Sequence, residues 1–395
     1  MGMSFRPYYF AREWQKMGHR VRIVGASFSH LRKKNPVVEK DFEIQEIDGV
    51  EFQWVKTGTY EGNGIARAKT MAEFCSKLWM NAGKIVKDFH PDAVISSSTY
   101  PLDTYPAQRI AKLAKCKYVH EGHDIWPLTL TELGGMSESN PFVKLMAIAE
   151  KSAYSKADHV VSVLPNAVEH MLQHGLQSSE KFTCIQNGIV MEDWESPEPL
   201  NQEHRSVFEN LHREGKFIVC YLGGHALSNA LDTLVEAAKL TSDDSSIAYV
   251  LIGKGVEKER LMNSAEGLDN IFFLPPVNKR QVPSALREAD ALYIGAAPCS
   301  LYKYGVSMNK LYDYMMAGKP IIYGVAAYNN DVALFKCGVT IESENAEEIV
   351  KAVNEFKAMS KEERMTMGQR GRINVMENYE YSKLAELFIK ALGKR

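Results

Sequence analysis

The strongest constraint on the fold of this chain is a regular alternation of short apolar runs with longer amphipathic segments. The apolar runs are rich in β-branched and aromatic residues, as at 217–222 and 248–252. The segments between them, such as 66–89 and 142–155, repeat their apolar residues with helical spacing. Buried strands that alternate with helices are typical of a parallel sheet covered by helices. The alternation therefore predicts an α/β fold.

The alternation occurs twice, once on each side of a polar segment that contains Pro197 and Pro199. The first series predicts strands at 20–24, 52–55, 92–96, 117–119, 159–163 and 182–185. The second series predicts strands at 217–222, 248–252, 271–274, 291–294, 320–323 and 338–341. A chain of 395 residues is also longer than one core usually supports. We therefore predict an N-terminal domain at 1–195, a linker at 196–214, a C-terminal domain at 215–380 and a C-terminal helix at 381–395.

The first residues of the chain, 1–14, have the pattern of a loop that enters a helix. In a doubly wound fold, a strand ordinarily precedes such a loop. We therefore expect the N-terminal sheet to lack its first strand, either truly or because the start of the chain is misplaced.

Composition excludes several classes of protein. The net charge of −2 lacks the basic excess of a dedicated nucleic-acid binder. The six cysteines are scattered without a Cys-x-x-Cys pair, which favours reduced thiols in a cytoplasmic protein. No apolar stretch approaches the ~18–20 residues that cross a bilayer, and the start of the chain has no apolar core of a signal peptide. We expect a cytoplasmic protein whose membrane contact, if any, is peripheral.

Two glycine turns in the second half follow predicted strands. Gly223 and Gly224 come after 217–222, and Gly253 and Lys254 come after 248–252. Ligands of open parallel sheets bind at the carboxyl ends of the strands, where the amides that start a helix can hold phosphate. The first turn is equally compatible with a tight connection that binds nothing, and the second favours a plain turn when it is taken alone.

The segment 304–320 is the most specific candidate site. Ser307 or Asn309 is a plausible N-cap of a helix, and Lys310 and Asp313 fall three residues apart on one face of it. A cation and helix-start amides can hold a pyrophosphate, and a carboxylate one turn later can accept ribose hydroxyls. The alternative is a solvated ion pair between Lys310 and Asp313.

This segment, Ser-x-Asn-Lys-Leu-x-Asp-Tyr-Met-x-Ala-Gly-Lys-Pro, resembles the donor-site signature of retaining GT-B glycosyltransferases of family 4. The bacterial branch that builds O-antigen and capsule, which includes aminosugar transferases, is the most similar. Further similar stretches lie, in order, at 120–127, 132–135, 163–166, 186–188 and 223–229. The resemblance covers nearly the whole chain. It implies two Rossmann-like domains that face each other across a cleft, the first binding the acceptor and the second the donor.

The resemblance also implies roles for individual residues. His123 would face the donor sugar, Lys310 would bind the pyrophosphate, and Asp313 would hold the ribose; His123 and Lys310 are the predicted catalytic residues. A surface histidine without a catalytic role is the alternative for His123. The other predicted donor-binding residues are Gly223, Gly224, Ser228, Asn229, Gly253, Lys254, Val277, Ser307, Asn309 and Leu311. The predicted acceptor-binding residues are Gly2, Arg6 and Asp124. No metal ion and no cofactor are expected, because fixed cations and helix dipoles would stabilise the leaving diphosphate.

The chain departs from the family pattern in the donor domain. Gly305 occupies the position of the first Glu of the Glu-x7-Glu motif, and His225 stands where an Arg is usual. These departures leave part of the phosphate clamp and the contacts to the sugar open.

We therefore expect a transferase that moves a sugar from a nucleoside diphosphate-sugar, with UDP the expected nucleotide, to a saccharide or polyprenyl-linked acceptor. The transferred sugar would be a hexose or an N-acetylaminosugar, the product would retain the anomeric configuration, and the pathway would build lipopolysaccharide or capsule. A GT-B epimerase acting on the nucleotide-sugar and a catalytically impaired nucleotide-sugar-binding subunit are the alternatives. A nicotinamide dehydrogenase is disfavoured because neither glycine turn matches Gly-x-Gly-x-x-Gly. The basic residues of 66–89 and 32–34 could contact anionic lipid, although packing of that helix on the sheet is favoured.

Overall fold

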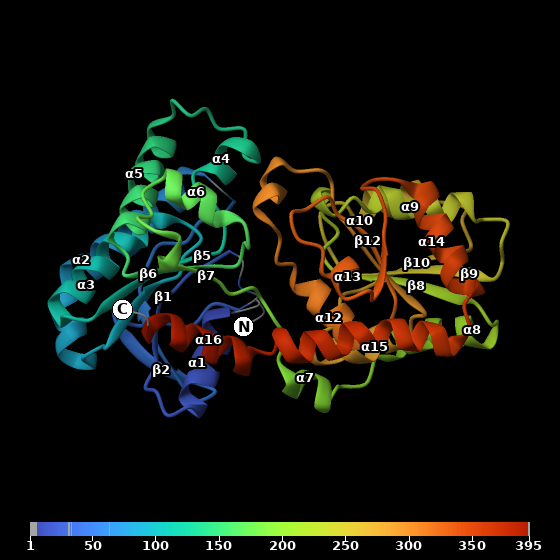
Figure 1. Ribbon diagram of the computed structural model, residues 1–395, viewed down its shortest axis with the longest axis horizontal. Helices are drawn as coiled ribbons and strands as arrows, with labels where there is room; N and C mark the ends of the chain where they lie inside the picture. Colours follow the sequence, from blue (N-terminus) through green and yellow to red (C-terminus); the bar gives the residue numbers. More distant parts are fainter. Residues whose placement is uncertain (1–5, 31, 33, 63, 394–395) are drawn as a thin grey trace. The chain divides into compact units, whose positions relative to one another are not determined.

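The computed structural model describes residues 6–30, 32, 34–62 and 64–393, and the chain divides into two compact units (Figure 1). The first unit comprises residues 1–186 and 381–395, and the second comprises 187–380. We call them the N-terminal and C-terminal domains. Both are Rossmann-like α/β domains with parallel strands. The division falls at 186/187, nine residues before the predicted end of the N-terminal domain at 195.

The C-terminal domain contains a six-stranded parallel sheet with the order β10-β9-β8-β11-β12-β13. Its strands are β8 (Phe217–Leu222), β9 (Ile247–Ile252), β10 (Ile271–Leu274), β11 (Ala291–Gly295), β12 (Ile321–Gly324) and β13 (Gly338–Thr340). Each lies within one residue of a strand predicted from the apolar runs. The order reverses beside β8, so the carboxyl end of this strand borders the crevice where ligands of such sheets bind.

Helices cover both faces of this sheet. Side chains of a strand alternate between its faces, so Ile218 and Cys220 enter one core while Val219 and Tyr221 enter the other. The helices are α7 (Met191–Glu195), α8 (Gln202–Arg213), α9 (Leu231–Leu240), α10 (Lys258–Ser264), α11 (Val282–Arg287), α12 (Asn309–Ala317), α13 (Asp331–Leu334), α14 (Ala346–Ala358) and α15 (Lys361–Asn378). The first core packs against α8, α11, α12 and α15, and the second packs against α9, α10 and α14 (Figure 1).

The predicted linker at 196–214 is for the most part a helix. Helix α8 occupies 202–213, and its Phe208 and Leu211 are buried in the core of the C-terminal domain. An amphipathic helix that exposes most of its residues is polar in composition, and this explains why composition alone suggested a linker.

The N-terminal domain contains two sheets. Strands β4 (Ala93–Ser96), β5 (Lys117–Gly122), β6 (His159–Ser162) and β7 (Phe182–Cys184) form a parallel sheet in that order. Strands β1 (Arg22–Ala26), β2 (Glu43–Ile47) and β3 (Val50–Val55) form the other, in the order β1-β3-β2. Strand β2, which the sequence analysis missed, pairs antiparallel with β3 across a two-residue turn at Asp48-Gly49. Both turn residues have positive φ, as this tight hairpin requires.

Helices also cover the N-terminal domain. They are α1 (Arg6–Lys16), α2 (Ile65–Phe89), α3 (Thr104–Ala114), α4 (Leu128–Glu132), α5 (Pro141–Lys156), α6 (Ala167–Gln173) and α16 (Tyr381–Gly393). Helix α2 buries Phe74 and Leu78 against Val55, so its apolar face is part of the core, as the packing interpretation expected. The first element in the described part of the chain is α1, and strands β1 and β4 each lie at an edge of their sheet. Whether the fold lacks its first strand stays a prediction.

The C-terminal helix α16 returns to the N-terminal domain and packs beside α1 (Figure 1). The indole of Trp14 donates to the carbonyl of Ala385 at 3.1 Å, and the rings of Phe10 and Phe388 lie edge to face with centroids 5.3 Å apart. Aromatic packing of this kind stabilises the contact beyond simple burial.

Two expectations drawn from composition can be compared with the structure. Within the described residues, the six cysteines form no disulfide. No helix in that part of the chain combines the length and the apolar character needed to cross a membrane.

Candidate functional site

Lys310, the second residue of α12, carries a positive charge whose hydrogen-bond partners are neutral. Its ammonium donates to the hydroxyl of Tyr221 at 3.1 Å and to Oδ1 of Asn229 at 2.5 Å, and it lies 4.9 Å from the centre of the Tyr221 ring. These partners are neutral, and among the described residues no carboxylate pairs with Lys310. Burial lowers the pKa of the ammonium to about 8. A buried cation without a counter-charge is costly, so the site favours an anionic ligand.

The glycine turn after β8 is tied to the same partners. The hydroxyl of Tyr221 and the side-chain amide of Asn229 both donate to the carbonyl of Gly224, at 2.8 and 3.0 Å. A Cβ on Gly223 would lie 2.8 Å from the Tyr221 hydroxyl oxygen, closer than such atoms approach. Glycine is therefore required here, and the turn and the Lys310 ammonium form one cluster. We call Lys310, Tyr221, Asn229, Gly223 and Gly224 the Lys310 pocket.

The second glycine turn packs backbone to backbone on the first. A Cβ on Gly253 would lie 1.9 Å from the carbonyl oxygen of Gly223. The N–H of His225 donates to the carbonyl of Lys254 at 2.9 Å, which joins the two turns. Gly253 therefore has a packing role that the sequence did not reveal, whereas Lys254 is exposed.

His225 lies between these turns and is fully buried. Burial, and secondarily the charge of Lys258, lowers the pKa of its imidazole to about 4. Within the described residues, neither ring nitrogen has a hydrogen-bond partner. The residue that replaces the usual Arg is therefore a neutral imidazole at physiological pH.

The start of α12 differs from the prediction. The N-cap position is held by Met308, and within the described chain no side chain caps the helix, so neither Ser307 nor Asn309 acts as the cap. The hydroxyl of Ser307 instead accepts the backbone N–H of Asn187 at 2.7 Å. Asn309 is the exposed first residue of the helix. The absence of a side-chain cap leaves helix-start amides for a ligand.

Asp313 and Lys310 do not pair with each other, which excludes the predicted solvated ion pair as an explanation of their spacing. Both carboxylate oxygens of Asp313 accept hydrogen bonds from the ammonium of Lys279, at 2.8 and 2.7 Å. Gly305, where the family has its first Glu, has a φ of 99°. Residues with a side chain rarely adopt this backbone conformation, so the loss of that Glu accompanies a different local backbone.

The remaining predicted donor-binding residues have different environments. Ser228 is an exposed residue of the short 3₁₀ helix at 227–229, and its carbonyl accepts the N–H of Ala297 at 3.0 Å. Val277 follows β10 and packs on the core, and the side chain of Leu311 is part of that core. The sequence analysis did not single out Tyr221 or Lys279, which lie far along the chain from the α12 residues they contact.

In the N-terminal domain, His123 is part of a hydrogen-bonded network at the ends of two neighbouring strands. Ser97 follows β4 and His123 follows β5, and parallel strands bring their carboxyl ends together. The Ser97 hydroxyl donates to Oε2 of Glu121 at 2.5 Å and lies 2.9 Å from Nε2 of His123. Because that hydroxyl donates to the carboxylate, its oxygen accepts from His123, which assigns the Nε2–H tautomer.

Burial and neighbouring charges determine the protonation states of His123 and Glu121. Burial lowers the pKa of the His123 imidazole, which is therefore neutral at pH 7. Burial opposes ionisation of Glu121, but the charge of Arg6 and the hydrogen bonds from Ser97 and Arg6 favour the carboxylate, so the pKa of this carboxyl is lowered. The network thus combines a neutral imidazole with a buried carboxylate.

Arg6, predicted to contact the acceptor, is buried and bonded to groups of its own domain, and its acceptor role stays a prediction. Its residue is 3% exposed, and its guanidinium donates to Oε1 of Glu121 at 2.8 Å and to the carbonyls of Ile185 and Gln186 at 2.5 and 2.7 Å. It acts as a positioning residue for the network. Asp124 is exposed beside His123, and Gly2 lies outside the described residues.

Both halves of the chain match known sequence families. Residues 1–188 match the family described as glycosyl transferase 4-like domain, and residues 202–374 match the family described as glycosyl transferases group 1. Among curated proteins, none matches the chain.

Solved structures share the fold over nearly the full length. Sucrose-phosphate synthase from Thermosynechococcus elongatus superposes with a TM-score of 0.71 at 14% identity, covering 98% of this chain and 92% of its own. WaaG, a glycosyltransferase involved in lipopolysaccharide biosynthesis, gives 0.64 at 14% identity, with 98% and 94% covered. Alr3699/HepE from Anabaena, solved with UDP and glucose, gives 0.61 at 14% identity, with 88% and 87% covered. At these identities the likeness concerns the fold.

Proposed function

Each half of this chain matches a glycosyltransferase family, and on that premise we propose that the protein moves a sugar from a nucleoside diphosphate-sugar to an acceptor hydroxyl. The single observation that carries the proposal is the Lys310 ammonium, which is partly buried among neutral partners beside a glycine turn and an uncapped helix start. A diphosphate supplies the missing counter-charge.

The Lys310 pocket would act on the leaving group. When the bond to the anomeric carbon breaks, negative charge grows on the departing diphosphate. Fixed donors that meet this charge stabilise the transition state more than the ground state, and so raise turnover. Lys310, the α12 amides and the Gly223-Gly224 turn are such donors. We propose that they do this without a metal ion or a cofactor, because a fixed ammonium and helix-start amides already supply positive charge to the diphosphate.

UDP is the first nucleotide to test, because Alr3699/HepE was solved with UDP and with UDP-glucose. We propose that Asp313 accepts the ribose hydroxyls. Its oxygens already bind Lys279, but each carboxylate oxygen can accept a second hydrogen bond. Lys279 would therefore stay in place and orient the carboxylate.

In the N-terminal domain, we propose that the neutral imidazole of His123 serves the acceptor side, with the exposed Asp124 as a further contact. The proposed acceptor is a saccharide or a polyprenyl-linked saccharide, the transferred sugar a hexose or N-acetylaminosugar, and the product retains the anomeric configuration. The shared fold with WaaG, a lipopolysaccharide enzyme, supports a role in surface polysaccharide synthesis. The proposed location is the cytoplasm, at the inner face of the membrane, with peripheral contact through the basic surface of α2.

A thermal-shift panel of UDP-, GDP-, ADP- and dTDP-sugars tests the proposal first. One nucleotide series should raise the melting temperature of the wild type and leave Lys310→Ala unchanged. If none of the nucleotides shifts the wild type, donor binding at the Lys310 pocket is wrong.

The alternative activities are separated by following the best donor by NMR. An epimerase would convert the nucleotide-sugar without any acceptor, whereas a transferase needs acceptor and yields a new glycosidic signal. Binding without turnover on any acceptor extract would indicate a subunit that has lost catalysis. The coupling constant of the new anomeric proton reports retention or inversion.

A further inference from the structure

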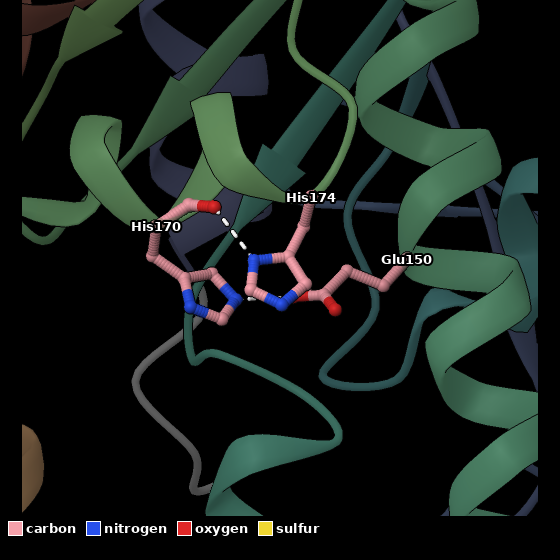
Figure 2. A group of neighbouring side chains, drawn as sticks. All are labelled: Glu150, His170 and His174. Carbon is pink, nitrogen blue, oxygen red and sulfur yellow. Dashed lines mark hydrogen bonds and ion pairs between the residues drawn. The ribbon is translucent and has the colours of Figure 1, made fainter.

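Three side chains in the N-terminal domain that are not members of the His123 network converge on one another (Figure 2). Glu150 lies on α5, His170 lies on α6, and His174 follows the end of α6. One carboxylate oxygen and one nitrogen from each ring lie within 4.8 Å of one another. We propose that these three residues hold a divalent transition-metal ion, with zinc the best fit to the ligand set. Neither the family matches nor the proposed sugar transfer assigns a role to them.

Local backbone structure brings the two histidines together. His170 and His174 are four residues apart, a spacing that places both rings on one side of a helix, and the rings stack with centroids 3.9 Å apart. Gly175, with a φ of 121°, follows directly. A Cβ there would lie 3.1 Å from the carbonyl oxygen of Lys151 on α5, so glycine allows the end of α6 to approach α5 closely.

The hydrogen bonds prepare His174 for a metal ion. Its Nδ1–H donates to the carbonyl of His170 at 2.8 Å, as Figure 2 shows. The proton therefore sits on Nδ1, which leaves the lone pair of Nε2 for a ligand. A backbone carbonyl that fixes the tautomer of a histidine is the usual outer partner of metal-binding imidazoles.

Glu150 and His170 supply the other two ligands. Nε2 of His170 lies 2.7 Å from Oε1 of Glu150, and the hydroxyl of Tyr154 donates to the same oxygen at 3.2 Å. A zinc ion bound at ~2.0–2.1 Å to both would hold these two atoms about 3.3 Å apart in a tetrahedral site. The ion would replace the shared proton after an opening of about half an ångström at this pair. One of the stacked rings would also turn, because an imidazole nitrogen binds a metal in the plane of its ring.

Burial explains why an ion is favoured and how it would enter. Glu150 is 2% and His170 is 6% exposed, so the carboxylate gains from a cation in its low-dielectric surroundings. His174 is exposed, which gives the ion access and leaves room for a water as fourth ligand. The ion would join α5 to α6 and stabilise the domain. This inference departs from the sequence expectation that the chain has no metal site.

The inference is tested by titrating zinc into the untagged, metal-stripped full chain, with binding measured by calorimetry and stability by thermal melting. We expect one zinc ion per chain and a higher melting temperature on binding. His174→Ala removes one of three ligands, and we expect a loss of affinity at least as large as the ~10–100-fold that follows removal of an outer partner. Glu150→Gln, which keeps the shape of the side chain and removes its charge, should also weaken binding.

A matched control comes from His212, an exposed histidine paired with Glu288 at 3.0 Å in the C-terminal domain. His212→Ala should bind zinc as the wild type does, and it retains all six cysteines. If Glu150→Gln fails to fold, His174→Ala alone decides, because it alters an exposed residue. The inference is overturned if the wild type binds no zinc at one-to-one stoichiometry, or if His174→Ala binds it as tightly.

Discussion

Replacing Lys310 by alanine removes the ammonium that the C-terminal domain encloses between Tyr221 and Asn229. The substitution leaves the core intact, because α12 buries its apolar side chains elsewhere and alanine favours a helix. It also relieves the burial of an uncompensated charge, so the variant should fold. Any loss of activity therefore reports on the reaction.

The expected size of the loss follows from the role of the ammonium. A fixed donor that meets charge developing in the transition state contributes roughly 2.7–4 kcal/mol. Since each ~1.4 kcal/mol is a factor of ten, turnover should fall about 100–1,000-fold. Substrate affinity should change less, because the ground-state diphosphate carries less charge on the bridging oxygen.

The assay is release of nucleoside diphosphate from the best donor with a saturating acceptor. Lys239→Ala is the matched control, since Lys239 is an exposed lysine of α9 whose side chain is 42% exposed. It should keep wild-type turnover. If Lys310→Ala retains activity within a few-fold of wild type, the ammonium does not meet the leaving group and the reasoning is refuted.

Four further predictions concern affinity and stability. The Lys310 ammonium of the unliganded protein loses its proton near pH 8, so wild-type affinity for UDP, measured by calorimetry, should weaken as pH rises through 8. Lys310→Arg should lack this dependence, because the guanidinium keeps its proton. The same change of affinity with pH in both proteins would contradict the prediction. Because that pKa lies below its ordinary 10.5, the folded chain binds fewer protons than the unfolded chain between pH 8 and 10.5, so the stability contributed by this group rises with pH. Lys310→Met should lack this rise and should melt at a higher temperature than the wild type at pH 7. An equal or lower melting temperature would argue against the prediction. Asp313→Ala should weaken UDP binding more than Lys279→Met does, and equal effects would reduce Asp313 to its ion pair. Arg6→Ala should lower the free energy of unfolding, measured by denaturant titration, by about 3–5 kcal/mol, because it leaves Glu121 buried without its cation. A change under 1 kcal/mol would show that another group compensates the charge of Glu121.

Most strands were predictable because local patterns determine them. The run 217–222 became β8 residue for residue, since a continuous apolar run fits a strand buried on both faces. Strand β2 was missed because Glu43–Ile47 contains only two apolar residues, Ile44 and Ile47, three positions apart, although the Asp48-Gly49 hairpin turn beside it was a usable signal.

The site was only partly predictable, because its contacts join distant parts of the chain. The sequence pointed to Lys310 at a helix start, but its partners Tyr221 and Asn229 lie 89 and 81 residues away. The pairing of Asp313 with Lys279 likewise spans 34 residues. Rules based on the spacing of residues within one helix or strand do not identify contacts between residues so far apart in the sequence.

Two polar side chains have partners that lie far away in the sequence. The N-cap expected at Ser307 or Asn309 is absent because the Ser307 hydroxyl instead accepts a hydrogen bond from Asn187, 120 residues away. Arg6, whose acceptor role stays a prediction, is buried against Glu121, 115 residues away. In both cases the partner of a polar side chain could not be identified from local sequence patterns.

The central claim is that the Lys310 pocket holds the diphosphate of a nucleotide-sugar, and a crystal structure of the chain with UDP tests it most directly. The account predicts a diphosphate oxygen about 2.7–2.9 Å from the Lys310 ammonium, with others facing the first amides of α12. A diphosphate bound elsewhere, with Lys310 still held only by Tyr221 and Asn229, would contradict it.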